Sequence, residues 1–327
     1  MCTAIAWCNG AFYFGRNMDL NYHFNEQVVI VPRGYSLSFK QERTIEAGHY
    51  AMIGMAAVVD DYPLYAEAVN EKGLCVAGLN FAGYAYNSPD ILPEKNNVAP
   101  YELIPWLLSQ CANTQQAKQL LMNTNVIAVQ FQENLPLPTL HWLISDKHSS
   151  IVFEFTKEGG RIFDNPYGVL TNNPTFDFHL TNLSNYINCS PQYPQNSFVP
   201  QMDLVPLGVG AGGLGLPGDV STTSRFVRAV FAKANSVCQK TKEDSISHFF
   251  HILDSVAMLK GSCLTASGEP YTTIYTSCAN VDDGTYYYKT YNNNQISAVS
   301  LYKENLEKNK LISYSLVTKM QMHHMNG

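Results

Sequence analysis

Residues 2–16 read CTAIAWCNGAFYFGR, two apolar runs on either side of Asn9 and Gly10. An Asn-Gly pair readily takes the positive φ angles of a type I′ turn. The flanking runs are rich in residues that favour strands, and they have the length of strands. The stretch therefore predicts a β-hairpin whose first strand begins at Cys2.

The register of this hairpin decides which side chains lie beside Cys2. If a two-residue turn sets the register, position 2 pairs with position 17. Asn17 and Asp19 then share the face of Cys2, whereas Arg16 points to the opposite face. Under this register, Arg16 can act beside Cys2 only through a bulge in the hairpin or by an approach from behind.

Most of the remaining chain is predicted to be antiparallel β, with four helices between the strand pairs. Strands are expected at 65–69 with 74–81, at 140–145 with 151–155, and in a meander at 271–278, 285–290 and 296–302. Helices are expected at 100–110, 114–122 behind an Asn113 cap, 224–234 and 245–259. Hairpins with few helices favour an α+β fold of packed sheets with outer helices, in one domain over residues 1–327. Residues 182–220, rich in Asn, Pro, Gly and Ser, are predicted to be a loop region.

Composition excludes several classes of partner. The 327 residues carry a net charge of −6 and only 15% charged residues, so we expect no nucleic-acid partner. The first residues lack the cationic start and apolar run of a signal peptide, and no apolar run is long enough to span a bilayer. We therefore expect a soluble, cytoplasmic protein with no membrane partner. The eight cysteines lack the spacing of a zinc site or a redox dithiol, and we expect no metal and no cofactor.

Cys2 differs from the other cysteines because it follows the initiator Met1. Removal of Met1 is expected because the next residue is small, and it would give Cys2 a free α-amine beside its thiol. An α-amine titrates near pH ~8 and a thiol near pH ~8.5, so the amine can accept the proton of its own side chain. The alternative is that Cys stands at position 2 by chance.

Short motifs along the whole chain weigh against chance. They are MCTA at 1–4, YFGRNMD at 13–19, NEKGL at 70–74, AGLNF at 77–81, LHW at 140–142, FDNP at 163–166, GVLTNNP at 168–174, GLPGD at 215–219 and SRF at 224–226. In this order and spacing they strongly resemble the choloylglycine hydrolase family of bile salt hydrolases and penicillin V acylases. The resemblance implies an N-terminal-nucleophile (Ntn) hydrolase fold, an αββα sandwich of four layers with two antiparallel sheets between helical layers. It also implies a homo-oligomer, a tetramer in many members.

The resemblance makes Cys2 the nucleophile and its α-amine the base. It places Arg16, Asp19 and Arg225 around Cys2. A guanidinium near the sulfur favours the thiolate, and a carboxylate near the amine holds it in place. Taken singly, each of the three charges can equally be an ordinary salt bridge.

Two asparagines are implied as donors to the oxyanion that forms when an amide carbonyl is attacked. They are Asn80, through its backbone amide, and Asn172, through its side-chain amide. Asn172 lies before Asn173 and Pro174, in a segment that would also suit a plain turn.

The family's substrates are amides, and the resemblance favours glycine- or taurine-conjugated bile salts. In family members that prefer penicillin V, an aromatic residue often replaces Asn80, so Asn80 favours bile salts over the penicillin V acylase alternative. A binding protein without catalysis is disfavoured because Cys2 is retained. An apolar steroid site is implied for five residues that could also belong to the core: Met18, Val59, Leu64, Phe131 and Leu135.

The segment Gly208-Val209-Gly210 is similar to the one associated with taurine conjugates in bile salt hydrolases, where Ser-Arg-Gly is associated with glycine. Residues without side chains leave room for a sulfonate, whereas an Arg at position 209 would suit a carboxylate. The alternative is a flexible loop whose glycines serve turning alone. The same glycines fit a dinucleotide-binding pattern, but no helix is expected after them, so we interpret them as a loop. His248 and His251, one helical turn apart, lack a third metal ligand.

Overall fold

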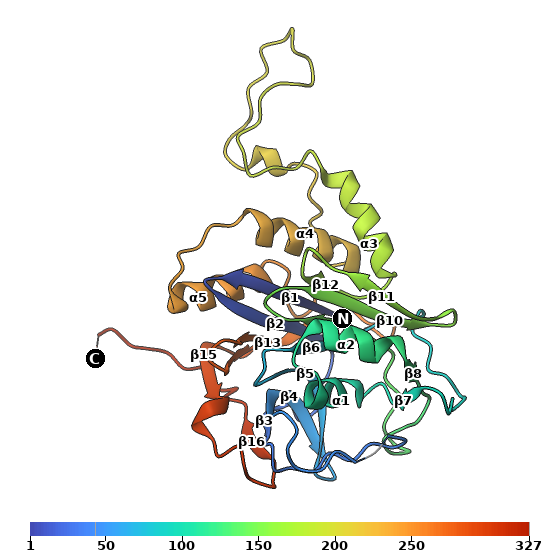
Figure 1. The fold of residues 1–327 in the computed structure, drawn as a ribbon. Coiled ribbons are helices and arrows are strands. Elements are labelled where there is room, and N and C mark those ends of the chain that lie inside the picture. The colour runs from blue at the N-terminus through green and yellow to red at the C-terminus, as the bar shows by residue number, and fades with distance from the viewer. Residues whose placement is uncertain (43, 327) are drawn as a thin grey trace.

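The computed structural model describes residues 1–42 and 44–326. Two large antiparallel sheets form its centre, and helices lie on their outer faces (Figure 1). The first sheet contains β1 (Cys2–Asn9), β2 (Ala11–Leu20), β12 (Val169–Leu170), β13 (Thr272–Asn280), β14 (Thr285–Thr290) and β15 (Asn293–Ser300). Its strand order is β12-β1-β2-β13-β14-β15. The hairpin that begins at Cys2 is therefore central to this sheet.

The second sheet has eight strands in the order β11-β10-β9-β6-β5-β4-β3-β16. They are β3 (Gln27–Val31), β4 (Met52–Val59), β5 (Tyr62–Asn70), β6 (Cys75–Asn80), β9 (Leu140–Ser145), β10 (Ser150–Thr156), β11 (Gly159–Asp164) and β16 (Ile312–Ser315). A short parallel pair, β7 (Asn96–Val98) and β8 (Thr124–Val126), lies beside it. All pairings within the two large sheets are antiparallel, as the hairpin pattern predicted.

The helices are α1 (Leu103–Gln110), α2 (Thr114–Met122), α3 (Phe176–Asn182), α4 (Thr222–Asn235) and α5 (Lys242–Asp254). The first two pack on the second sheet, and α4 and α5 pack on the first sheet. The layers are therefore helix, sheet, sheet, helix, which confirms the predicted αββα sandwich. Asn113 caps α2 by accepting a hydrogen bond from the Gln116 amide, as its position before the helix predicted.

Two large apolar clusters fill the layers, one including the space between the sheets and the other beneath α1 and α2. Strand β3 contributes to both, because Val28 and Ile30 face one way and Val29 and Val31 the other. A strand buried on both faces reads as a continuous apolar run, which explains why β3 lacked the alternating pattern of the predicted strands. No helix in the described part of the chain is long and apolar enough to cross a membrane.

The predicted hairpin register is wrong by one residue. Asn9 pairs with Ala11 across Gly10, whose φ is 77°, and Cys2 therefore pairs with Met18 and Ala4 with Arg16. Residues directly opposite share a face, so Arg16 lies on the face of Cys2 without any bulge in this pair. Asn17 and Asp19 lie on the opposite face, contrary to the sequence-based expectation.

Candidate active site

Cys2, Arg16 and Met18 meet on the face of the hairpin that looks toward the second sheet. The Cys2 Sγ lies 3.8 Å from the Met18 Sδ, and the Arg16 Nη2 lies 3.7 Å from the same sulfur. All three side chains are buried, Arg16 completely. The guanidinium is thus brought close to the thiol through a shared apolar neighbour.

The Arg16 guanidinium is anchored in the second sheet. Strands β5 and β6 pair as far as Glu67 with Ala77 and then diverge. The Arg16 Nη1 donates to the carbonyls of Ala66, at 3.0 Å, and Gly78, at 2.6 Å. It thus occupies the place where the next backbone pairing between β5 and β6 would lie. Burial alone would lower the pKa of Arg16, but electrostatic interactions with Cys2 and Glu67 outweigh burial and raise that pKa above its ordinary value. Arg16 therefore stays a cation.

The opposite face of the hairpin carries a second buried cation, Arg225, which comes from α4. Its Nη1 donates to the Cys2 carbonyl at 2.5 Å and to the Thr3 Oγ1 at 2.8 Å, and it lies 3.8 Å from the Asp19 Oδ2. Burial lowers the pKa of Arg225, and Asp19 and Cys2 oppose that effect. Arg225 thus fixes the backbone at Cys2.

Asn172 connects the backbone nitrogen of Cys2 to the second sheet. Its Oδ1 accepts from the Cys2 nitrogen and from the Arg225 Nη2, both at 2.8 Å. Its Nδ2 donates to the Asn80 carbonyl at 2.8 Å. Two donors on one side and a carbonyl on the other determine which amide atom is oxygen. One N–H of the predicted oxyanion donor is therefore already engaged, and the second N–H is left for a ligand.

The backbone amide of Asn80 is directed toward the same side as Arg16. Phe81 donates its N–H to the Thr139 carbonyl on the β9 side. Because backbone groups alternate along a strand, the Asn80 N–H points away from β9. The Gly78 carbonyl on that side accepts from Arg16. This orientation agrees with the predicted use of the Asn80 amide as an oxyanion donor.

Asp19 lies beside the start of the chain and carries an unsatisfied oxygen. Its Oδ1 accepts from Thr273 at 2.6 Å, whereas its Oδ2 has no hydrogen-bond partner among the described residues. Its backbone pairs with Met1 in both directions. With Met1 attached, the nitrogen of Cys2 is a peptide nitrogen.

Comparison with known proteins identifies the family. The model of the linear amide C–N hydrolases, choloylglycine hydrolase family, matches residues 2–314. The chain belongs to the choloylglycine hydrolase family. It is 51% identical over 327 residues to the bile salt hydrolase/transferase of Lactiplantibacillus plantarum, with both chains fully covered. A crystal structure of the conjugated bile acid hydrolase of Clostridium perfringens superposes with a TM-score of 0.92 at 40% identity, again over the whole of both chains.

A penicillin V acylase from Agrobacterium tumefaciens shares the fold, with a TM-score of 0.75 at 20% identity over 96% of this chain and 91% of that chain. As a member of the choloylglycine hydrolase family, the chain is an amidohydrolase. The sandwich observed here is therefore shared with the conjugated bile acid hydrolase and with the penicillin V acylase.

Four residues predicted to contact the acyl group lie at the end of β4, in β5 and in the loop that follows β8: Val59, Leu64, Phe131 and Leu135. All four are half-buried. Phe131 packs against Tyr62 and Tyr101, with 5.5 Å between ring centroids in each case. Leu64 and these three aromatic residues belong to one small apolar cluster. Leu64 is two residues before Ala66, whose carbonyl accepts a hydrogen bond from Arg16.

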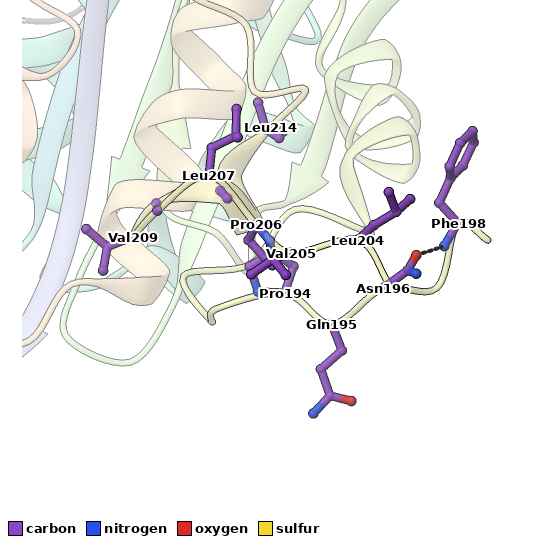
Figure 2. A pocket seen from close by; sticks show the side chains of 13 residues that line it. Pro194, Gln195, Asn196, Phe198, Leu204, Val205, Pro206, Leu207, Val209 and Leu214 are labelled. Atoms are coloured by element: carbon purple, nitrogen blue, oxygen red, sulfur yellow. Dashed lines mark hydrogen bonds between the residues drawn. The ribbon is translucent and has the colours of Figure 1, made fainter. Parts of the chain in front are cut away.

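The predicted selectivity segment, in contrast, is not brought to Cys2. It lies in residues 187–216, which form an arm that projects beyond α3 and α4 (Figure 1). Gly208, Val209 and Gly210 are exposed, and Gly210 has a φ of 85°, a backbone angle that favours glycine. The positive φ angle of this turn therefore accounts for the glycine at position 210. The arm curves around an open apolar hollow of about 630 Å³, along which Leu204, Leu207 and Leu214 are arranged (Figure 2).

Sequence reasoning missed several residues that contact the surroundings of Cys2, Arg16 and Asp19. Four of them are buried and hydrogen-bonded in the site: Thr3, Glu67, Thr273 and Tyr275. Glu67 left a usable signal, because it is the one charged residue in the otherwise apolar strand YPLYAEAVN. A carboxylate in a buried strand requires partners, which the sequence alone did not identify.

Proposed function

We propose that this chain hydrolyses the amide bond of glycine- or taurine-conjugated bile salts, with Cys2 as an N-terminal nucleophile after loss of Met1. The observation that carries the proposal is the convergence of Arg16, Arg225 and Asn172 on the thiol, carbonyl and nitrogen of Cys2. The similarity of this chain to a bile salt hydrolase/transferase and to a conjugated bile acid hydrolase supports bile salts as the substrate class.

In the proposed mechanism, the α-amine of Cys2 takes the thiol proton and the thiolate attacks the amide carbon. The developing oxyanion accepts from the Asn80 amide and from the remaining Asn172 N–H. Collapse of this intermediate breaks the C–N bond, and the α-ammonium protonates the leaving nitrogen. The acyl group then remains on Cys2 as a thioester, which water hydrolyses with the α-amine as base.

The surroundings of the Cys2 nitrogen suit a free amine. The Asn172 Oδ1 already accepts from this nitrogen, and the Asp19 Oδ2 is a buried acceptor that receives no hydrogen bond within residues 1–42 and 44–326. A buried unsatisfied carboxylate oxygen is unfavourable, and an α-ammonium would supply a charged donor. We therefore assign Asp19 and Asn172 to holding the amine, with Asn172 also reaching the oxyanion through its other N–H.

Release of amine from conjugates tests the proposed function. Purified protein is incubated with glycocholate, taurocholate and penicillin V, and free glycine, taurine and 6-aminopenicillanic acid are measured. Release of glycine or taurine at a much higher kcat/KM than 6-aminopenicillanic acid supports the proposal. A preference for penicillin V would support the acylase alternative, and no release of any product would support a binding protein without catalysis.

We further propose that the chain forms a homo-oligomer, a tetramer by family resemblance, through the arm at 187–216. Leu207, Val209 and Phe198 are almost fully exposed there, and apolar side chains concentrated on a projecting segment suit contact with another copy. The arm projects away from the Cys2 of its own chain. Residues 208–210 would therefore determine the proposed taurine preference by contacting substrate bound in a neighbouring copy. Molar mass by light scattering, for the protein and for Leu207→Ser, tests the assembly.

The eight cysteines are all free, which agrees with a proposed cytoplasmic location because the cytoplasm keeps thiols reduced. Localisation is tested by fractionating cells and following the protein with an antibody.

We also propose that residues 1–327 form one catalytic domain.

A further inference from the structure

The two sheets exchange charged side chains across their interface. Arg16 crosses from β2 into the second sheet, and Glu67 crosses from β5 into the first. The Glu67 Oε1 accepts from the Ser277 Oγ at 2.9 Å and from the Tyr286 hydroxyl at 2.5 Å. Its Oε2 accepts from the Tyr275 hydroxyl at 2.9 Å. All of these side chains are buried.

Glu67 is also the anionic partner of Arg16. The Arg16 Nε lies 3.8 Å from the Glu67 Oε2, and both side chains are almost completely buried. Burial raises the pKa of Glu67 above its ordinary value, and Arg16 and the three hydroxyl donors offset only part of that rise. A carboxylate that accepts three hydroxyl hydrogen bonds beside a guanidinium is stabilised in its ionised form. The two residues therefore form a buried ion pair with every carboxylate oxygen satisfied.

We propose that Glu67 is a positioning residue, which holds the Arg16 guanidinium beside Cys2 and balances part of its charge there. Arg16 faces the Cys2 thiol on one side and Glu67 on the other, so the negative charge of Glu67 reduces the attraction between Arg16 and a thiolate. The three hydroxyls keep that charge in place. The inference rests on the proposed function only in taking Cys2 as the reacting thiol.

Other charged and titratable groups near Cys2 stay the same when Glu67 is replaced. Asp19 lies on β2, Arg225 comes from α4, and Tyr271 precedes β13 within the electrostatic range of Cys2. Tyr275 and Tyr286 have pKa values raised well above their ordinary value, first by burial, and stay neutral. A Glu67 variant therefore changes one charge in a constant environment.

The decisive experiment measures the rate at which iodoacetamide alkylates Cys2 as a function of pH, by mass spectrometry of the N-terminal peptide. In Glu67→Gln, the loss of the carboxylate charge is expected to move the midpoint of this curve to lower pH by about one unit. Tyr286→Phe is the matched control, because it removes a donor to Glu67 but leaves the charge. Its midpoint should stay within about 0.3 units of the parent protein, a shift well below the one expected for charge removal.

Steady-state kinetics add a second readout. The acidic limb of kcat/KM for a bile conjugate should move with the alkylation curve in Glu67→Gln. Glu67→Asp, which keeps the charge on a shorter side chain, should retain the parent pH profile with a lower kcat. Equal midpoints for the parent protein and Glu67→Gln would overturn the proposal and leave Glu67 a purely structural residue.

Should Glu67→Gln fail to fold, Glu67→Met, an uncharged side chain of similar length, replaces it. This variant removes the same charge, so the midpoint should again move to lower pH, and an unmoved midpoint counts against the proposal. Alkylation needs no hydrolysis. A shifted alkylation curve in a protein that releases no amine from any conjugate would therefore contradict the proposed substrate while supporting the role of Glu67.

Discussion

The group around Cys2 and the arm at 187–216 are opposite kinds of structure in one chain. Arg16 and Arg225 are completely buried, and each makes several hydrogen bonds to backbone carbonyls or side chains. On the arm, Leu207 and Val209 are almost fully exposed, and a side chain added at Gly208 or Gly210 would meet no atom within 4 Å.

This difference separates two kinds of role. Buried polar groups with several partners each are held in one arrangement, which is what the chemistry of a nucleophile requires. Exposed apolar residues on a projecting loop instead suit contacts with a second molecule. Substitutions near Cys2 should therefore affect catalysis strongly, and substitutions on the arm should affect only assembly and choice of substrate.

The largest effect is expected for Cys2, the proposed nucleophile. Cys2→Ser should keep the fold and lower kcat for conjugated bile salts by about a thousandfold or more, because an alkoxide forms far less readily than a thiolate near neutral pH. Melting temperature and circular dichroism verify the fold, and released taurine measures turnover. Substantial activity in Cys2→Ser would remove the thiol from the mechanism.

A smaller effect is expected from His179, which supports Asn172. Its Nε2 lies 2.9 Å from the Asn172 carbonyl, and burial lowers the pKa of His179 to about 4. The unfolded chain takes up a proton near pH ~6.5 and the folded chain does not, so stability is full above pH ~6.5 and falls as pH drops toward 4. We expect a loss of about 2 kcal/mol between pH 7 and pH 5 from this group. Urea unfolding at both pH values should show a smaller loss for His179→Gln, and an equal loss would contradict the assignment.

Phe131 lies between the two extremes, half-buried against Tyr62 and Tyr101. If it covers the steroid, Phe131→Asn should raise KM for bile conjugates about tenfold and lower the melting temperature only slightly. Met122→Ser, at an exposed position on α2, is a control that should leave KM unchanged. A large fall in melting temperature with an unchanged KM would place Phe131 in the core instead.

The smallest effect is expected on the arm. The pair Gly208→Ser with Val209→Arg should shift the ratio of taurocholate to glycocholate cleavage toward glycine by about threefold, through a guanidinium exposed to solvent. Because Gly208 has a φ of 158°, Val209→Arg alone is the variant with less backbone strain. Competition assays with both conjugates measure the ratio, and light scattering verifies the assembly. An unchanged ratio in both variants would exclude the segment from selectivity.

Much of the fold was predictable because its signals are local. The hairpins around Asn9 with Gly10 and around residues 70–73 follow from turn residues between apolar runs, and Asn113 marks the start of α2. Strand β3 was missed because burial on both faces removes the alternation of polar and apolar residues. Helix α3 was missed because its seven residues are too few to show a helical period.

The site was predictable only in part. Motif order predicted Cys2, Arg16 and Arg225 as site residues. Which hairpin side chains share the face of Cys2 depends on the register, however, and the observed register differs from the predicted one by one residue at Gly10. The partners of Arg16 lie far away in the sequence, since Glu67 belongs to another sheet. Long-range contacts of this kind have no local signature, so the sequence alone could not assign Glu67 a role.

The central claim is that Cys2 acts with its own α-amine, and Met1 provides the most direct test. Protein is prepared with and without inhibition of methionine aminopeptidase, and intact mass gives the fraction of chains that lack Met1. Taurine release from taurocholate is then measured on the same samples. The account predicts activity in proportion to the fraction without Met1, approaching zero when Met1 is retained. Full activity in protein that keeps Met1 would contradict it.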